Sequence, residues 1–440
     1  MDSTCLPTDD RVASTEQQQR DDEQAHLANP ALSAMSETTD THALHNLSSI
    51  LSAPARHSTE RSLGVVTRPV SSDLPTALRA YLSAHDIPPE IYDVQIPRFF
   101  RVHLPGRIVT LEELQRDVGT TAIAPVVWAP GFYSCPAHVR LVDSALYQAG
   151  TVLGMDASSS LAVHALSLTP ADHVLDLCCA PGAKLVYLAQ ALHATQSVPF
   201  EGTVTGVDVS KDRLAICRSL LKKHKIVNAR LFCADGTTFG ALAPVWGVAV
   251  LNKRTPPLIR QADFSSPRVF HAPQTLRANR PCLGPMALYD KVLVDAECTH
   301  DGSVVHILKY REATTGQWRG VGKLWLDDQQ LADLESLQRR LLCNGWRLLK
   351  PGGVLVYSTC SLSRRQNEAI VEWFLDEALD ARPDPIDVPV GLPDACRVEI
   401  AGVQDAALRM DPLRSQTSGL FVARLRKIVP DGYVLSTKDF

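Results

Sequence analysis

The sequence of 440 residues lacks several features that mark special classes of protein. No apolar run approaches the roughly 18 residues that a membrane-spanning helix needs, and no basic segment followed by an apolar stretch resembles a secretory signal. The eleven cysteines form no Cys-x-x-Cys pair, which argues against a zinc ribbon, and their odd number argues against a disulfide scaffold. We therefore expect a soluble, intracellular monomer of the nucleus, nucleolus or cytoplasm, with no membrane and no metal partner.

Net charge is also small, at −4, but the charges are unevenly distributed. Residues 1–60 carry ten acidic side chains against three arginines, whereas residues 251–280 carry six basic side chains against Asp263 alone. The basic residues of this stripe are Lys253, Arg254, Arg260, Arg268, Arg277 and Arg280. Clustered basic residues of this kind are typical of a surface that binds phosphates, although a solvated insertion loop explains them equally well.

Aromatic residues are scarce at 6%, but 45% hydrophobic residues suffice for a core, and the length allows two or three domains. Residues 1–62 are polar and acidic without periodicity, which predicts a disordered tail, and residues 429–440 form a short C-terminal tail. Between them we expect a small α+β module over 63–150, associated with RNA, and a catalytic domain over 151–428.

Two alternatives are open for the arginine-rich and aromatic segment of the 63–150 module. A predicted strand over 97–102 contains Phe99 and Phe100 beside Arg98 and Arg101, and Arg107 follows it. Charge and stacking at these positions would hold RNA. Equally, the two phenylalanines would simply belong to the hydrophobic core.

Strands and helices alternate from about residue 150 onward. We expect strands over 174–177, 204–208, 229–234, 292–295 and 354–358, with helices over 183–192 and 212–224 and a long helix from about 327. This alternation is typical of a parallel, doubly wound sheet, whose ligands bind beyond the carboxyl ends of the strands.

A turn of small residues follows the first predicted strand: Cys178, Cys179, Ala180, Pro181, Gly182, Ala183 and Lys184. A dinucleotide site would need Gly-x-Gly-x-x-Gly, whereas this turn has only Gly182, and Pro181 lacks an N–H donor. The turn therefore disfavours a pyrophosphate ligand and, with it, a nicotinamide-dependent dehydrogenase.

Aspartates end the next two strands. Asp208 is placed to accept from ribose hydroxyls, and Asp235 from the amine of adenine. Each aspartate alone is weak evidence for a cofactor site, because aspartates at strand ends often only cap the next helix. The ordered series of turn, Asp208 and Asp235 predicts adenosine without pyrophosphate, which means S-adenosylmethionine.

Two cysteines, Cys298 and Cys360, directly follow later strands and so belong to the same edge of the sheet. By contrast, we take Cys217, Cys233, Cys282 and Cys343 as small buried side chains. A thiolate beside S-adenosylmethionine suits methylation at carbon 5 of a pyrimidine, which becomes nucleophilic once a thiolate adds to carbon 6. Asp295 would hold the cytosine edge, with Lys184 close by.

In order and spacing, the motifs over about residues 95–426 resemble the RsmB/NOP (Sun-type) RNA cytosine-5 methyltransferases. The turn resembles the family's Cys-Ala-Ala-Pro-Gly-Gly-Lys, residues 295–298 its Asp-Ala-Pro-Cys, and residues 358–361 its Ser-Thr-Cys-Ser. Asn367 and Glu368 match its Asn-Glu helix, and residues 418–423 its closing strand.

The resemblance implies an α/β fold, with a Rossmann-like class I methyltransferase sheet after the small α+β module and the disordered tail. It implies Cys360 as nucleophile, Cys298 as the group that assists release, and RNA, either tRNA or rRNA, as substrate. The implied catalytic residues also include Asp295 and Lys184. The turn Cys178–Lys184, with Asp208, Asp235 and Asp295, would bind the cofactor.

The sequence departs from the family pattern at three places. Cys179 and Ala183 replace an alanine and a glycine in the turn, which would tighten the methionine pocket. Glu297 replaces the proline before Cys298, and Met155 stands where the family usually has glutamine. A carboxylate at position 297 would raise the pKa of the neighbouring thiol. Glu297 is thus the main argument for the alternative, a catalytically silent RNA-binding or assembly factor that keeps the fold.

Overall fold

The computed structural model describes residues 69–192, 202–244, 268–273, 276, 288–312, 314–320 and 327–429. The predicted acidic tail over 1–62 and the C-terminal tail from residue 430 lie outside these ranges. Of the basic residues in the predicted stripe, only Arg268 lies inside them.

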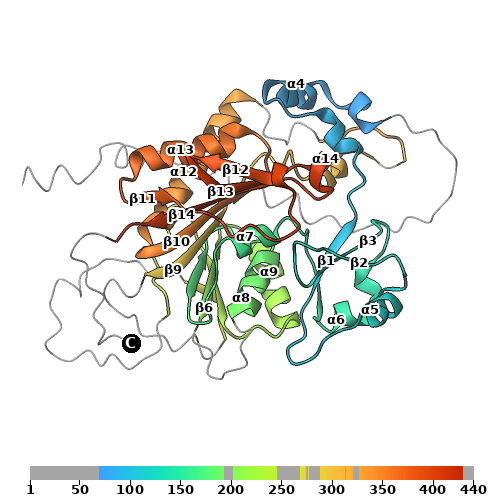
Figure 1. The fold of residues 1–440 in the computed structure, drawn as a ribbon, viewed down its shortest axis with the longest axis horizontal. Helices are drawn as coiled ribbons and strands as arrows, with labels where there is room; N and C mark the ends of the chain where they lie inside the picture. The colour runs from blue at the N-terminus through green and yellow to red at the C-terminus, as the bar shows by residue number, and fades with distance from the viewer. Residues whose placement is uncertain are drawn as a thin grey trace, which may run out of the picture. The chain divides into compact units, whose positions relative to one another are not determined.

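The described part of the N-terminal module contains a small antiparallel sheet and three α-helices, the first of which lies apart from this sheet (Figure 1). The strand order is β2 (Ala124–Pro125), β3 (Phe132–Cys135), β1 (Arg98–Val102) and β4 (Val152–Gly154). The helices are α4 (Thr76–Ala84), α5 (Leu111–Val118) and α6 (Ala145–Gln148). Helix α5 begins where the Thr110 side chain accepts from the Glu113 N–H, and it ends at Gly119, whose φ of 77° favours glycine.

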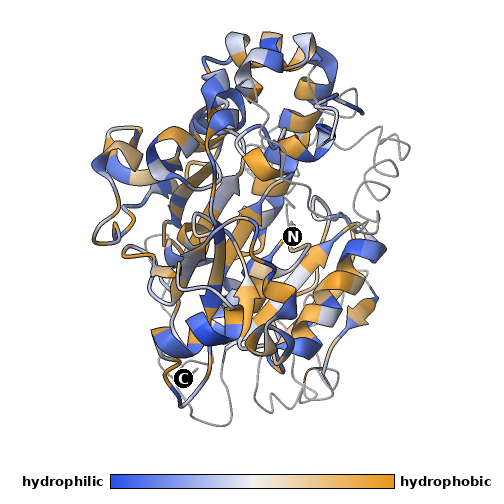
Figure 2. Cartoon of the chain, turned by 90° about the vertical axis from the view of Figure 1, so that its right-hand side faces the viewer, coloured by the Kyte–Doolittle hydropathy of each residue, from blue (hydrophilic) through white to orange (hydrophobic). Residues whose placement is uncertain are grey.

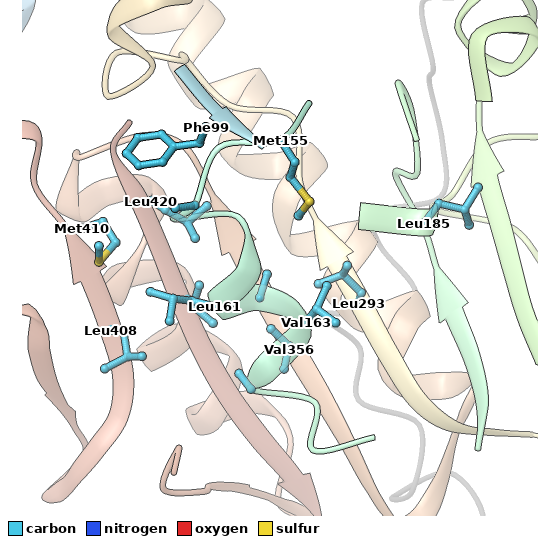
Figure 3. Close-up of a cluster of buried hydrophobic side chains, with 14 of the residues drawn as sticks. Phe99, Met155, Leu161, Val163, Leu185, Leu293, Val356, Leu408, Met410 and Leu420 are labelled. Carbon is cyan, nitrogen blue, oxygen red and sulfur yellow. The ribbon is translucent and has the colours of Figure 1, made fainter. Parts of the chain in front are cut away.

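The aromatic residues of β1 are core residues, which settles the choice between the two alternatives for this segment. Phe100 is fully buried against Val109 and Leu114, and Phe99 packs beside Met155 in the main core (Figure 3). Arg101 is also buried, with its guanidinium 4.0 Å from the centre of the Tyr187 ring. Neither phenylalanine is therefore available to stack on a base, and association of the module with RNA stays a prediction.

The second sheet carries the predicted α/β pattern. Five of its strands are parallel neighbours: β10 (Leu349–Thr359), β9 (Tyr289–Asp295), β5 (His173–Asp176), β6 (Thr203–Asp208) and β7 (Ala229–Cys233). The predicted strands and helices thus all exist, with ends shifted by a few residues.

The sheet is mixed, whereas the alternation along the chain predicted a parallel one. Antiparallel strands flank the parallel centre: β14 (Leu420–Lys427), β13 (Val403–Met410), β12 (Arg397–Ile400) and β11 (Ala381–Pro383) on one side, and β8 (Val269–His271) on the other. Ala401 and Gly402 join β12 to β13 with φ values of 48° and 79°. Both values are positive, as in the tight hairpin turns that connect antiparallel strands.

Helices cover both faces of the sheet, as Figure 1 shows. On one face lie α7 (Ser160–His164), α8 (Ala183–Leu192) and α9 (Lys211–Lys223), and on the other α12 (Asp328–Arg347) and α13 (Glu368–Glu377). In β9, Leu293 packs on the first face while Val292 and Val294 pack on the second, because side chains alternate along a strand. Several helices carry both colours in Figure 2; α12, for example, buries Leu331, Leu334 and Leu341 and exposes polar residues.

Within the described ranges, no helix is long and apolar enough to span a bilayer.

We expect Phe100→Ala to lower the free energy of unfolding by about 3–5 kcal/mol, because it leaves a cavity in the core of the module. Denaturant unfolding of the purified protein measures this change. Ile108→Ala removes an exposed side chain of the same module and should change stability by less than about 0.5 kcal/mol. Equal effects of the two substitutions would contradict the assignment of Phe100 to the core.

Candidate active site

The parallel register of β9 and β10 brings the two predicted catalytic cysteines together. Asp295 pairs with Ser358 across these strands, so the segments that follow them leave the sheet side by side. The Sγ atoms of Cys298 and Cys360 lie 3.3 Å apart as a result. Cys298 is fully buried, whereas Cys360 is partly exposed.

A close approach of two backbones holds Cys360 in place. Gly302 donates its N–H to the carbonyl of Cys360 at 3.1 Å and accepts from the N–H of Gly419 at 2.7 Å. A Cβ atom on Gly302 would lie 2.7 Å from the Cys360 carbonyl oxygen and 3.0 Å from the Gly419 Cα. Only glycine allows this approach without displacing the Cys360 segment.

Lys184 and Asp295 form an ion pair at the centre of the site. The Lys184 Nζ lies 2.8 Å from the Asp295 Oδ2, and the Ser358 hydroxyl donates to the other carboxylate oxygen at 2.7 Å. Burial disfavours the ammonium, but the Asp295 carboxylate outweighs it and raises the pKa of Lys184. Asp295 is therefore oriented by two donors from two elements, and a carboxylate has further lone pairs for a ligand.

The small-residue turn is held against Asp208 and Arg213. The N–H of Ala180 donates to the Asp208 carboxylate at 3.3 Å, and Arg213 of α9 donates to the Ala180 carbonyl at 2.8 Å. Burial raises the pKa of Asp208, while Arg213 acts in the opposite direction. Asp208 thus faces the turn, as the sequence predicted, and Arg213 is a residue that the sequence analysis missed.

Glycines make room on both sides of the turn. At Gly182, whose φ is 109°, a Cβ would lie 3.2 Å from the Cys217 Sγ. At Gly206 of β6, a Cβ would lie 2.9 Å from the Cys179 Sγ. The side chain of Cys179 therefore packs over Gly206. The volume that this side chain adds, relative to the alanine of the resembled motif, lies against the sheet.

Asp176, at the end of β5, is a second residue of the site that the sequence analysis missed, after Arg213. Both of its carboxyl oxygens are buried, and neither has a hydrogen-bond partner among the described residues. Burial, and then the nearby Asp295 carboxylate, raise the pKa of Asp176 well above its ordinary value. Its position at a strand end, like that of Asp208, was the signal that could have identified it.

The turn and its acids fit S-adenosylmethionine. Asp176, Asp208 and Asp295 repel one another, because each of the other two raises the pKa of Asp176. A ligand that carries a sulfonium and an ammonium group would relieve this repulsion, and it would supply partners for the unpaired oxygens of Asp176.

Asp235 also lies beyond the end of its strand, at the same edge of the sheet. Its Oδ1 accepts from the N–H and the hydroxyl of Thr237, both at 2.8 Å. One carboxylate oxygen therefore stabilises the turn after β7, which is the ordinary role of a strand-end aspartate. Contact between Asp235 and adenine stays a prediction.

Met155, at the position where the resembled family usually has glutamine, is a core residue. Its side chain is buried in the cluster of Figure 3.

The Glu297 side chain points to His300 and Arg213, and Glu297 is not among the largest causes of the raised pKa of Cys298. Its Oε1 accepts from Nε2 of His300 at 3.2 Å, and its Oε2 lies 3.7 Å from Arg213. Burial opposes ionisation, but the hydrogen bond from His300 and these positive charges lower the pKa of Glu297. Burial and the neighbouring Cys360 sulfur are the main causes that raise the pKa of Cys298.

His300 completes this group, and the sequence analysis did not single it out. Its Nδ1 lies 3.0 Å from the Cys360 Sγ and 3.8 Å from the Cys298 Sγ. The three ligand-type atoms lie within 4.8 Å of one another. Two thiolates on a tetrahedral zinc would be about 3.8 Å apart, given Zn–S bonds of about 2.3 Å. The 3.3 Å between the sulfurs is shorter, and the group has three ligand-type side chains where a structural zinc site has four.

The other cysteines divide between core and surface. Cys217 is buried and Cys343 partly buried, but Cys233 is exposed, so its assignment to the core was wrong. As the last residue of β7, Cys233 reaches the edge of the sheet, where helices no longer cover it. Cys282 lies outside the described residues.

The chain matches the family profile described as 16S rRNA methyltransferase RsmB/F over residues 163–244 and 269–426, which is more than half of its length. The chain belongs to the RsmB/F family. The family is one of S-adenosylmethionine-dependent RNA cytosine-5 methyltransferases, so membership excludes the dehydrogenase alternative. The resemblance inferred from the motifs is thereby confirmed.

Curated relatives act on two kinds of RNA. Over 312 residues the chain is 24% identical to the tRNA (cytosine(49)-C(5))-methyltransferase of Pyrococcus abyssi, covering 69% of this chain and 80% of the relative. Over 322 residues it is 25% identical to the ribosomal RNA small subunit methyltransferase F of Pectobacterium atrosepticum, covering 69% and 51%. The RsmB/F chain thus spans only about half the length of this bacterial relative.

Solved structures share the fold. A methyltransferase homologue from Pyrococcus horikoshii has a TM-score of 0.53 and 24% identity, covering 81% of this chain and all of its own. The structure of NSun6 from Pyrococcus horikoshii with SFG has a TM-score of 0.53 and 16% identity, covering 81% of this chain and 99% of its own. The class I methyltransferase sheet predicted from the sequence is confirmed.

We expect Asp208→Ala to weaken binding of S-adenosylmethionine by about 1–3 kcal/mol, because ribose hydroxyls would lose their buried acceptor. Isothermal titration calorimetry on the folded variant measures this loss. Asp212→Ala, at an exposed position in the first turn of α9, is the matched control and should leave the affinity unchanged. Equal affinities of the two variants would remove Asp208 from the cofactor site.

Proposed function

We propose that this RsmB/F chain transfers a methyl group from S-adenosylmethionine to carbon 5 of a cytosine in RNA, with Cys360 as the nucleophile. The observation that carries the proposal is the convergence of Cys360, Cys298, the Lys184–Asp295 pair and the turn with Asp208 at one edge of the sheet. Nucleophile, polar anchor and methyl donor would then meet in one place, as the reaction requires.

Cys360 is the better nucleophile of the two cysteines. Its partly exposed sulfur can reach carbon 6 of a base, whereas Cys298 is buried and its pKa is raised well above the ordinary value of a thiol. A thiol that stays protonated at neutral pH is a weak nucleophile. Cys298 is instead suited to assist release of the methylated base, since its sulfur touches that of Cys360.

Asp295 and Lys184 would position the base. When the Cys360 sulfur bonds to carbon 6, electron density moves toward carbon 5, and the ring needs a partner for its polar edge. The Asp295 carboxylate, fixed by Lys184 and Ser358, supplies that partner. S-adenosylmethionine, when bound, supplies the methyl group as a sulfonium electrophile.

The proposal extends to the class of RNA that is methylated, which is either a tRNA or an rRNA. A tRNA and an rRNA are both compatible with the relatives. Bisulfite sequencing of cellular RNA with and without the gene would identify the modified cytosine. If no site depends on the gene while the protein still binds S-adenosylmethionine, the silent-factor alternative gains.

We expect Cys360→Ala and Cys298→Ala to abolish turnover in opposite ways. Without the nucleophile, Cys360→Ala should form no covalent adduct with RNA. Cys298→Ala should still permit attack and methyl transfer but stall at release, so that protein accumulates on RNA. A nuclease-sensitive shift on a denaturing gel measures the adduct, and Cys343→Ala, in α12 away from the site, is the control.

An adduct in Cys360→Ala with none in Cys298→Ala would reverse the assignment of the two cysteines. No crosslink from either cysteine to RNA that carries a 5-substituted cytosine trap would favour the silent factor.

A further inference from the structure

The residues around Cys360 include an acid and a base to which the proposed function assigns no role. Glu297 stands where the resembled motif has proline, and His300 lies two residues beyond Cys298. The structure places Glu297, His300 and Cys360 in a line, with contacts of 3.2 Å from Glu297 Oε1 to His300 Nε2 and of 3.0 Å from His300 Nδ1 to Cys360 Sγ. The two ring nitrogens therefore face a carboxylate on one side and a thiol on the other.

Glu297 fixes the tautomer of this imidazole. An ionised carboxylate only accepts hydrogen bonds, so Nε2 of His300 must carry a proton to donate to Glu297. In the neutral ring, Nδ1 is then an acceptor directed at the Cys360 sulfur. A base, its orienting acid and a nucleophile in this order have the same arrangement as an activated serine or cysteine nucleophile.

We propose that His300, oriented by Glu297, is the general base that converts Cys360 to its reactive thiolate. The proposal deepens the proposed function and rests on it, since it assigns the group that prepares the nucleophile of that reaction. His300 is the catalytic base, because it contacts the reacting sulfur, and Glu297 is a positioning residue that acts through His300.

In the addition of Cys360 to carbon 6 of the cytosine, one proton and two electron pairs move. The Sγ–H bond of Cys360 breaks and its proton moves to Nδ1 of His300, while the sulfur electron pair forms the bond to carbon 6. The π pair of the C5–C6 bond shifts to carbon 5, which would bond to the methyl group as the sulfonium S–CH3 bond breaks and its electron pair stays on the sulfur of the departing thioether. In the elimination, the proton of carbon 5 passes to solvent, the ring double bond re-forms, and the pair of the C6–S bond returns to Cys360 as a thiolate beside the imidazolium.

The surrounding charges stabilise the imidazolium that forms when His300 takes the proton of Cys360. Burial lowers the pKa of His300, whereas the hydrogen bond to Glu297 and the negative charge of its carboxylate act in the opposite direction. From α9, Arg213 faces Glu297 at 3.7 Å. From α8, Lys184 adds positive charge near Cys360, because the two groups interact electrostatically.

The remaining neighbour is the helix that follows. The His306 ring of α11 (Val304–Ile307) lies tilted against His300 with 4.8 Å between ring centres, and the Tyr310 ring meets His306 edge-on at 6.0 Å. Burial and the charge of His300 lower the pKa of His306 to about 4, so this second histidine is neutral at neutral pH. His300 is therefore the ring of this pair that can take the positive charge.

The test measures thiol reactivity without RNA or methyl donor, so it is independent of the methylation itself. The full-length protein is treated with iodoacetamide between pH 5.5 and 9, and alkylation of the Cys360 peptide is quantified by mass spectrometry. Wild-type Cys360 should react at neutral pH. In His300→Gln, the rate at pH 7 should fall about tenfold or more, and the profile should move to higher pH, toward that of a free thiol.

Glu297→Gln keeps a hydrogen-bond acceptor for His300 but removes the charge, so its profile should lie between those of wild type and His300→Gln. It also tests the proposal if His300→Gln does not fold. His138→Gln, at an exposed position in the N-terminal module, is the matched control and should superimpose on wild type.

A His300→Gln or Glu297→Gln profile identical to that of wild type would overturn the proposal. A shifted profile together with no methylation of any RNA would overturn the proposed function but support His300 as the base of Cys360. The two failures are therefore distinguishable.

Discussion

The buried carboxylate of Asp301 ties together the two segments that carry the cysteines. It accepts from the Thr299 hydroxyl of its own segment, and from the Ser361 hydroxyl at 2.6 Å and the Leu362 N–H at 2.8 Å of the other. The Tyr81 hydroxyl of α4 approaches the same carboxylate at 3.3 Å. Loss of these donors would leave a buried carboxylate without hydrogen bonds, which costs free energy, so the network favours a single arrangement of the two segments. The 3.3 Å contact between Cys298 and Cys360 depends on that arrangement.

The N-terminal module contributes to the same arrangement, although none of its residues touches the two cysteines directly in the contacts described. The Tyr92 hydroxyl donates to the backbone carbonyl of Asp301 at 2.9 Å, and that of Tyr81 lies 3.1 Å from the Thr299 hydroxyl. The module thus helps to order the catalytic segments from outside the sheet. Its position beside them is consistent with a role in presenting RNA, which stays a prediction.

Charge in the site is balanced between two groups. Asp208 and Glu297 both face Arg213, with contacts of 3.9 Å and 3.7 Å, so one guanidinium joins the proposed cofactor-binding acid to the residue that orients the proposed base. On the other side, Lys184 balances Asp295. Burial and the other acids raise the pKa of Asp176 and outweigh Lys184, which acts in the opposite direction. A cationic ligand would stabilise the charge of Asp176 further.

The sequence alone determined the order of the strands along the chain and the edge at which the site lies. Strand-end residues of parallel strands share one edge by geometry, so Asp208, Asp295, Cys298 and Cys360 could be grouped without coordinates. The antiparallel flank was missed because the alternation of strand and helix along the chain does not by itself fix strand direction, which depends on tertiary pairing.

Only the tertiary structure decided which side chains meet. The burial of Phe99 and Phe100, the exposure of Cys233 and the unpaired oxygens of Asp176 depend on what packs around them. Glu297 is the clearest case: adjacency in sequence suggested an effect on Cys298, but its side chain turns toward His300 and Arg213. A motif fixes which residue types are present, whereas their protonation and contacts depend on distances that only the folded chain sets.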